Sequence, residues 1–204
     1  MKIIGLTGPS GAGKGEASRI FAQYGIPAVD TDAVYHAILS NSQHPCTAEL
    51  SAAFGASILD DEGLVDRKIL SKTVFGKQNT PALLHTLNTI THKYIMAETR
   101  TVLQSYEKNG ARAALIDAPQ LFEAHADREC DLVVAVLAPQ ELRLARIVTR
   151  DGITEEAATR RIDAQHDDAF FKERCDAVLI NDGNTASLAE QIRAFLIKYN
   201  VGLS

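Results

Sequence analysis

The chain begins with a short apolar run, a glycine-rich loop and an amphipathic helix, and this order limits the folds open to it. Residues 2–6 predict a buried strand, and residues 8–15 read Gly-Pro-Ser-Gly-Ala-Gly-Lys-Gly. From Lys14 onward apolar residues recur at helical spacing until Gly25, where the pattern ends. Glycines at a strand–loop–helix junction let backbone amides converge on a polyphosphate, and the helix N-terminus adds positive potential. The segment therefore predicts a nucleotide-phosphate loop in an α/β fold.

The loop itself supplies most of the residues that would hold the phosphates. We expect Lys14 to reach the terminal phosphates. The usual pattern places Ser or Thr after the lysine as a Mg²⁺ ligand, but here Gly15 stands in that place and Glu16 follows. An acid in the first helical turn complements the helix dipole, and the metal would lack a direct side-chain ligand here. The predicted nucleotide contacts in this segment are Gly8, Gly11, Ala12, Gly13, Lys14, Gly15 and Glu16.

Four further apolar runs predict the rest of a sheet. They cover residues 26–29, 113–116, 132–137 and 177–180. Continuous apolar runs are typical of strands that are covered on both faces. Helical patterns separate them, so the sequence predicts an α/β fold, a three-layer sandwich with a five-stranded parallel sheet of the P-loop kinase type.

Two long helical segments connect strands of this predicted sheet. We expect a single domain over residues 1–204, whose core is made of residues 1–32, 113–139 and 176–204. Helical patterns fill residues 33–112, which is too much chain for one crossover and predicts an insertion that binds the acceptor. Residues 140–175 are largely helical and rich in arginine, and they predict a lid. Lid closure excludes water, which would otherwise compete as a phosphoryl acceptor.

The amino-acid composition argues against two classes of binding partner, nucleic acids and membranes. The 204 residues are 46% hydrophobic and carry a formal net charge of −5, so there is no general attraction to nucleic acid or to an anionic membrane. No apolar run approaches the roughly 20 residues that span a bilayer. The three cysteines are far apart and lack the spacing of a metal site, which favours free thiols in a reducing cytoplasm. We therefore expect a cytoplasmic protein with no nucleic-acid or membrane partner.

Carboxylates stand where two predicted strands end. Asp30-Thr31-Asp32 follows the second strand, and parallel sheets bind ligands at this edge. Transfer of a phosphoryl group to a hydroxyl needs a group that accepts its proton, often Asp, and we predict Asp32 in that role. Asp30 would cap the next helix or hold Mg²⁺ through water, and a purely capping role for Asp30 or Thr31 is the simpler interpretation. Asp117 ends the third strand, where it would hold Mg²⁺ directly or through water, or would serve only as a turn residue.

Arginines cluster in the predicted lid. Arg143, Arg146 and Arg150 recur at i, i+3 and i+7 on one helix, and further arginines follow on the next. Arginines that converge on a transferring phosphoryl group stabilise its charge, although a solvated basic face would show the same spacing. The turn after the last strand contains Asn181 and Gly183, at an edge that suits contacts to an adenine base.

These segments together resemble the dephospho-coenzyme A kinase family, over nearly the whole chain and in the same order. The matching segments are Gly5 through Lys14, Asp30-Thr31-Asp32, Phe54-Gly55 with Gly63 to Arg67 and Phe75, Asp117 to Glu123, Arg146 to Gln165, and Asn181-Asp182-Gly183. Two segments depart from the family pattern. Gly15-Glu16 replaces Ser/Thr-Thr, and Thr91-His92-Lys93-Tyr94-Ile95 stands where the family has His-Pro-Leu-Ile, so that His92 matches the histidine and the proline is lost.

The resemblance implies transfer of the ATP γ-phosphate, with Mg²⁺, to the ribose 3′-hydroxyl of dephospho-CoA, which gives CoA and ADP. It implies Asp32, Lys14, Arg146 and Arg150 in catalysis, and Asn181 at the adenine. It also implies that the acceptor is bound by Asp32, Arg67, His92 and Asp117. Monomer and small homo-oligomer both stay open.

Two alternatives remain from the residues. Asp30-Thr31 followed by Tyr35 faintly resembles cytidylate kinase, another nucleoside-monophosphate kinase. Gly15-Glu16 would also suit a non-catalytic nucleotide-binding module.

Overall fold

A computed structural model of the protein describes residues 1–76 and 81–201. The chain divides into two compact units. We call Met1–Val29 together with Leu103–Ser204 the sheet unit, and Asp30–Val102 the helical unit. Each unit is described by itself below.

A five-stranded sheet forms the centre of the sheet unit, as the sequence predicts. Its strands are β1 (Lys2–Thr7), β2 (Ala28–Asp30), β3 (Ala113–Asp117), β4 (Leu132–Leu137) and β5 (Ala177–Ile180), in the order β2-β3-β1-β4-β5. β1 pairs in parallel with β3 and β4, and β4 pairs in parallel with β5. β2 begins at Ala28 instead of Ile26. The carbonyl of Pro27 accepts a hydrogen bond from the Leu115 amide, but proline has no N–H with which to extend the ladder.

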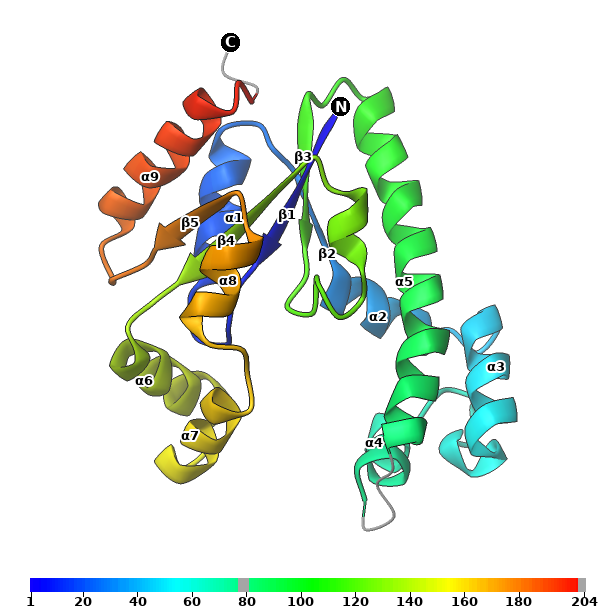
Figure 1. The fold of residues 1–204 in the computed structure, drawn as a ribbon. Coiled ribbons are helices and arrows are strands. Elements are labelled where there is room, and N and C mark those ends of the chain that lie inside the picture. The colour runs from blue at the N-terminus through cyan, green and yellow to red at the C-terminus, as the bar shows by residue number, and fades with distance from the viewer. Residues whose placement is uncertain (77–80, 202–204) are drawn as a thin grey trace. The chain divides into compact units, whose positions relative to one another are not determined.

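Both faces of the sheet are covered by helices, because its apolar side chains alternate between two cores. Val134 and Val136 of β4 belong to one core, which includes residues of α1 (Lys14–Gln23) and α9 (Thr185–Lys198). Ala135 and Leu137 face the other way and pack with Phe171 of α8 (Asp168–Arg174). Figure 1 shows α1 and α9 on one side of the sheet and α8 on the other. The predicted three-layer α/β sandwich is confirmed.

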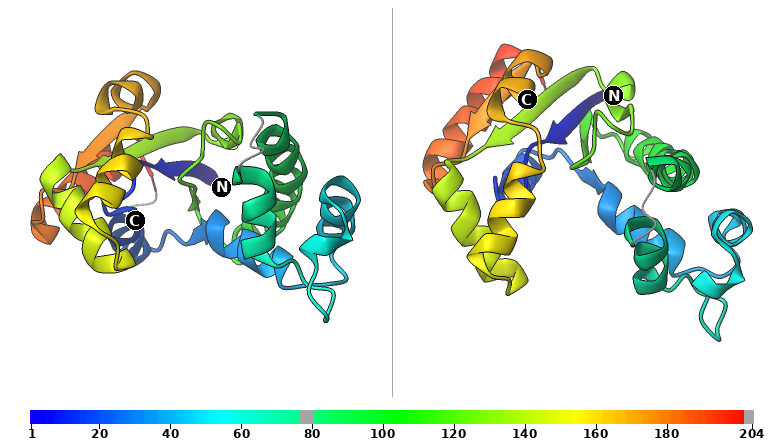
Figure 2. Two further views of the ribbon diagram at one scale, coloured as in Figure 1. Left: turned by 90° about the horizontal axis from the view of Figure 1, so that it is seen from below. Right: turned by 60° about the horizontal axis from the view of Figure 1, so that its bottom comes forward.

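Two short helices follow β4 and form a pair. They are α6 (Gln140–Asp151) and α7 (Glu155–Asp163), and they lie side by side in both views of Figure 2. Their contact is apolar and includes Ile147, Ala158 and Ile162. The Thr154 hydroxyl accepts a hydrogen bond from the Ala157 amide, which caps α7. The predicted helices of residues 140–175 are therefore present, while their role as a lid stays a prediction.

The helical unit has its own core. It contains α2 (Thr31–Leu39), α3 (Pro45–Phe54), α4 (Arg67–Phe75) and the larger part of α5 (Pro81–Lys108), which ends in the sheet unit. Buried apolar residues from all four helices pack together, among them Ile38, Leu50, Leu70 and Leu87. The helical content predicted for residues 33–112 is present. The single-domain organisation and the acceptor-binding role of this segment stay predictions.

Within residues 1–76 and 81–201, the remaining elements are two short 3₁₀ helices, η1 (Ala56–Ile58) and η2 (Ala126–Glu129). The three cysteines are free thiols, as expected from their spacing. Within the ranges that the structure describes, no helix has the length and apolar character needed to cross a bilayer.

Candidate active site

Glycines give the loop between β1 and α1 its shape. Gly8, Gly11 and Gly13 have φ angles of 136°, 78° and 96°, which side chains rarely allow. A Cβ atom at Gly8 would lie 2.2 Å from the carbonyl oxygen of Val136, and one at Gly11 would lie 2.6 Å from that of Arg143. The backbones of β4 and α6 therefore approach the loop so closely that only glycine fits.

Two side chains satisfy the carbonyl oxygens of this loop. The Arg146 guanidinium donates from Nη1 to the carbonyl oxygens of Gly11, at 3.1 Å, and Ala12, at 3.3 Å. Asn181 donates from Nδ2 to the carbonyl of Ala12 at 3.0 Å, and its Oδ1 accepts from Arg146 Nη2 at 3.2 Å. These donors neutralise oxygens that would otherwise repel a phosphate. A Cβ atom at Gly13 would lie 2.1 Å from Asn181 Nδ2, so the same contact requires glycine there.

A second pair of side chains holds Ser10 at the tip of the loop. Arg143 is 6% exposed and donates from Nε to the Ser10 carbonyl at 3.0 Å. Its Nη2 donates to Oε1 of Gln165 at 3.1 Å, and the same oxygen accepts from the Ser10 amide at 3.0 Å. Burial lowers the pKa of the Arg143 guanidinium. Both polar groups of the Ser10 backbone are thus bound by one Arg–Gln pair.

Lys14 opens α1 directly after the loop. Its ammonium lies 3.4 Å from the carbonyl oxygen of Gly8, which keeps the charge at the root of the loop. The first amides of an α-helix have no intrahelical carbonyl to bind, so the amides of Lys14 and Gly15 are suited to an anion. Glu16 forms an ion pair with Arg19, one turn further along α1. This pairing offsets the carboxylate that the sequence places close to the predicted phosphate site.

Arg150 lies at the end of α6, within reach of the loop. Its Nη2 lies 3.4 Å from the Ser10 hydroxyl, while Nε and Nη2 form a bidentate pair with Asp151 at 2.7 and 3.0 Å. Arg161 of α7 also donates to Asp151. The hydrogen bond from Arg150, with help from Arg161, lowers the pKa of the Asp151 carboxyl to about 2. Asp151 therefore stays ionised at neutral pH and ties the two helices together.

The turn after β5 contributes to the same region. Asn181 is 5% exposed, and its Oδ1 also accepts from the Gly183 amide at 3.3 Å. Its side chain is thus bound to the loop and to its own turn. Contact with an adenine base, which the sequence predicts for Asn181 and Gly183, stays a prediction.

Asp117 stands at the carboxyl end of β3, as predicted. It is half-buried and is the register partner of Leu6 on β1, one residue before the last residue of that strand. The amide of Ala118 donates to the Leu6 carbonyl at 3.0 Å, so the chain leaves β3 next to the root of the loop. A carboxylate therefore stands at the same sheet edge as the loop.

The remaining predicted carboxylates lie in the helical unit. Asp30 is the N-cap of α2, and its Oδ1 accepts from the amides of Asp32 at 2.9 Å and Ala33 at 3.1 Å. The capping interpretation of Asp30 is thus correct. Asp32 lies in the first turn of α2 with an exposed side chain. Its role as a base stays a prediction.

The two acceptor residues implied by the resemblance also lie in the helical unit. Arg67 is the first residue of α4, is exposed, and places Nη1 3.0 Å from Nδ1 of His36. His92 is half-buried on α5. The structure thus brings together the loop, Lys14 and the predicted lid arginines within one unit, and Asp32, Arg67 and His92 belong to the other.

The sequence interpretation missed Ser10, Gln165 and the structural task of Arg143. The i, i+3, i+7 spacing places Arg143 on the same helix face as Arg146. This shared face was the only sequence signal that could have indicated a contact between Arg143 and the loop. Nothing in the local pattern marks Gln165, because its partners are distant in sequence.

The chemistry of the side chains fits a weakly held Mg²⁺. Among residues 1–76 and 81–201, no group of three or more His, Cys, Asp and Glu side chains could hold a metal ion. Mg²⁺ commonly keeps several waters and binds through one or two carboxylates together with the phosphates of a substrate. A strand-end carboxylate such as Asp117 fits that mode of binding.

Comparison with protein families and comparison with curated proteins give the same family. A profile of the dephospho-CoA kinase family matches residues 2–187. The dephospho-CoA kinase of Latilactobacillus sakei is 37% identical over 194 residues, covering 95% of this chain and 94% of the relative. That of Corynebacterium jeikeium is 38% identical over 195 residues, covering 96% and 98%. The solved structure of dephospho-CoA kinase from Campylobacter jejuni is similar with a TM-score of 0.68, 27% identity and 98% of each chain covered.

Proposed function

The chain belongs to the dephospho-CoA kinase family, and we propose that its glycine loop holds ATP while Asp32 activates the acceptor. The protein is a phosphotransferase that phosphorylates dephospho-CoA with ATP in coenzyme A biosynthesis. The hydroxyl that we propose as acceptor is the 3′-hydroxyl of the ribose. One observation supports the assignment most: the loop carbonyls are bound by Arg146 and Asn181, next to the open N-terminus of α1.

Binding of the phosphates would use the loop and its lysine. The amides of residues 11–16 and the ammonium of Lys14 would donate to the β- and γ-phosphates. Preorganised donors stabilise the charge that spreads over the transferring phosphoryl group without reorganising during the reaction. Lys14→Ala should therefore weaken ATP binding and reduce turnover together. Unchanged ATP affinity and rate in that variant would contradict the assignment.

Asp32 would accept the proton of the attacking hydroxyl. Asp32 has an exposed side chain in the first turn of α2, where the helix N-terminus favours a carboxylate. General-base catalysis typically contributes 10²–10⁴-fold, so Asp32→Asn should lower kcat by roughly 10²-fold or more with little change in unfolding temperature. Asp61→Asn, another exposed carboxylate of the helical unit, is the matched control and should be silent. Normal turnover of Asp32→Asn would remove Asp32 from this role.

Arg150 and Arg146 would act on the transferring phosphoryl group from α6. Arg150 has an exposed guanidinium close to the Ser10 hydroxyl, and Arg146 lies against the loop carbonyls. Because positive charge at the transferring group stabilises the transition state, replacing Arg150 with Ala should lower kcat more than it raises the KM for ATP.

Mg²⁺ would be held by the ATP phosphates, by water, and through water by Asp117 or Asp30. When bound, the ion neutralises phosphate charge. A Cβ atom at Gly15 meets nothing within 4 Å, so a serine fits in the position of the usual metal ligand. Gly15→Ser should lower the Mg²⁺ concentration that gives half-maximal activity, and Gly15→Ala should not.

An acceptor panel tests the function itself. ADP formation should require dephospho-CoA and should not occur with CMP or AMP in its place. CMP-dependent ADP formation would favour a cytidylate kinase, and ATP binding without turnover would favour a non-catalytic module. A cytoplasmic location, and a monomeric or small homo-oligomeric state, are part of this proposal.

A further inference from the structure

The connector between α7 and α8, residues 164–167, contains a side chain that holds the glycine loop. Oε1 of Gln165 accepts hydrogen bonds from the Ser10 amide at 3.0 Å and from Nη2 of Arg143 at 3.1 Å. All four residues of the connector are exposed, so it is not held by a buried side chain of its own. Fixing an exposed segment costs conformational entropy, which other contacts must offset before Gln165 can stay at the loop.

His166 attaches the connector to α8. Its ring lies parallel to that of Phe170, with 3.6 Å between the ring centroids and 5° between the planes. Between the two rings in the sequence, Asp167 caps α8 by accepting a hydrogen bond from the Phe170 amide at 2.9 Å. One turn further along α8, the Arg174 guanidinium lies 4.7 Å from the centre of the Phe170 ring. The stacked pair therefore fixes the residue that directly follows Gln165.

The same histidine also contacts the segment that follows β3. Nε2 of His166 lies 3.3 Å from Oε1 of Glu123, and the neighbouring Phe122 packs edge-on against Phe170 with centroids 5.4 Å apart. Leu121, directly before them, is fully buried and anchors this segment. The side chains of His166 and Glu123 are 47% and 44% exposed, so water screens their attraction and the stacked rings supply the larger part of the stabilisation.

We propose that His166 is a positioning residue for ATP, which acts by holding Gln165 against the loop. The contacts with Phe170 and Glu123 fix the connector, the fixed connector presents Gln165, and Gln165 binds the Ser10 amide at the tip of the loop. His166 itself touches neither substrate. This inference rests on the proposed function, because it adds a residue to the apparatus that holds ATP there.

Three variants separate the ring stack from the contact with the carboxylate. His166→Ala removes both, whereas His166→Phe keeps a ring that can stack on Phe170 and loses only the contact with Glu123. Lys172→Ala is the matched control, because Lys172 is an exposed residue of α8 that lies two positions from Phe170 and thus on another face of the helix. Calorimetry gives the dissociation constant for ATP, steady-state kinetics give kcat and both KM values, and urea unfolding gives the stability.

We expect His166→Ala to raise the dissociation constant and the KM for ATP by about fivefold, because an aromatic pair changes an equilibrium by roughly that factor. The change in kcat should be smaller, and the unfolding midpoint should hardly move. His166→Phe should stay within about twofold of the original protein, since an exposed charged contact contributes little. Lys172→Ala should behave as the original protein.

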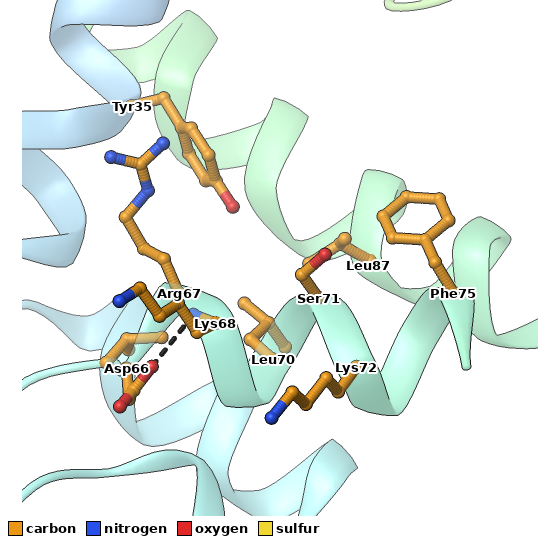
Figure 3. Close-up of a pocket in the computed structure, with 10 residues that line it drawn as sticks. Tyr35, Asp66, Arg67, Lys68, Leu70, Ser71, Lys72, Phe75 and Leu87 are labelled. Atoms are coloured by element: carbon orange, nitrogen blue, oxygen red, sulfur yellow. Dashed lines mark hydrogen bonds between the residues drawn. The ribbon is translucent and has the colours of Figure 1, made fainter. Parts of the chain in front are cut away.

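Binding of the acceptor should not respond to these changes. The predicted acceptor residue Arg67 lines a cavity of about 950 Å³ beside α4, and the residues that line this cavity belong to the helical unit (Figure 3). The KM for dephospho-CoA should therefore be the same in His166→Ala and in the original protein.

A double-mutant cycle with Gln165→Ala is the decisive measurement. If His166 acts through Gln165, His166→Ala should weaken ATP binding in the original protein and cause no further loss in Gln165→Ala. Losses that multiply, or a normal ATP affinity of His166→Ala, would overturn the inference and leave the function standing. Binding of ATP without ADP formation from dephospho-CoA would contradict the function, and the dissociation constants would still decide the inference. If the unmodified protein binds no ATP, both fail.

Discussion

Two glycines two positions apart, Gly13 and Gly15, should respond in opposite ways to substitution by alanine. Gly13 has a φ of 96°, and a Cβ atom there would lie 2.1 Å from Asn181 Nδ2, whereas Gly15 is helical with open space around its Cα. Gly13→Ala should therefore destabilise the fold by about 1–3 kcal/mol, the typical cost of a strained backbone conformation. Gly15→Ala should stabilise it by about 0.5 kcal/mol, because alanine loses less conformational entropy in a helix. Urea unfolding of the two variants measures both values.

The same two variants should also differ in their affinity for ATP. Gly13→Ala should weaken ATP binding, because displacement of Asn181 releases the carbonyl of Ala12. ATP affinity of Gly15→Ala should change much less. Equal losses of stability in the two variants would show that the contact between Gly13 and Asn181 does not constrain the loop.

The free energy of unfolding should fall at alkaline pH, because two half-buried thiols ionise more readily in the unfolded chain than in the folded protein. Burial, with the nearby acids Asp127 and Glu129, raises the pKa of the Cys130 thiol to about 12, and burial raises that of Cys175 to about 12. An unfolded cysteine titrates near 8.5, so this contribution is complete below about pH 8.5 and is lost progressively as the pH rises toward 12. For Cys130 the loss at pH 10 should be on the order of 1–2 kcal/mol.

Urea unfolding at pH 7.5 and pH 10 measures this loss. Replacing Cys130 with Ala should reduce the difference between the two pH values, because the variant has no thiol to ionise at that position. An identical pH dependence in Cys130→Ala would contradict the prediction.

Regular elements follow from the sequence more reliably than the contacts between them. The apolar run 132–137 has the bounds of β4, and the helical patterns predicted over residues 33–112 include α4, because both are set by local periodicity. The strand-end position of Asn181 was predictable as well. Its bond to Ala12 was not, because the direction of a side chain toward a segment 169 residues away is not encoded in spacing. The phosphate loop could thus be located from sequence, and the groups that hold it could not.

Arg143 illustrates this limit at the level of one helix. It shares a face of α6 with Arg146 and Arg150, and the spacing suggests one role for all three. In the structure Arg143 is buried against Ser10 and Gln165, whereas Arg150 is exposed. We therefore expect Arg143 to position the loop without touching the substrates.

Loss of Arg143 should raise the KM for ATP more than it lowers kcat. Arg143→Ala removes the part-buried hydrogen bonds from a charged guanidinium to the Ser10 carbonyl and to Gln165, and a hydrogen bond to a charged group contributes about 1.5–3 kcal/mol. We expect a KM for ATP that is roughly tenfold higher, with partial rescue by Arg143→Lys, which keeps one donor. Arg160→Ala, which removes an exposed arginine of α7, is the control and should have no effect. A fall in kcat alone would assign Arg143 to the chemistry instead.

At the scale of the whole molecule, the core under α1 and α9 in the sheet unit is larger than the core of the helical unit. In the sheet unit, Ile4, Leu115 and Val136 pack with α1 and α9 around a continuous sheet. In the helical unit, Leu50 and Leu70 belong to a smaller cluster built from four helices. A smaller unit buries a smaller fraction of its surface, so it gains less stability per residue. The two units should therefore open separately.

Hydrogen exchange should detect this division and its link to the substrates. Amides of the helical core, such as those of Leu50 and Leu70, should exchange with a lower opening free energy than those of Ile4 and Leu115 in the sheet, because local units open independently of global unfolding. Dephospho-CoA added alone should slow exchange mainly in α4, and a non-hydrolysable ATP analogue should slow it mainly in the loop and α1, because a ligand stabilises the state that binds it. Mass-spectrometric exchange of the full chain resolves these segments. One common opening free energy, with equal protection of both units by either ligand, would mean that the two cores act as a single cooperative body and that the substrates are not divided between them.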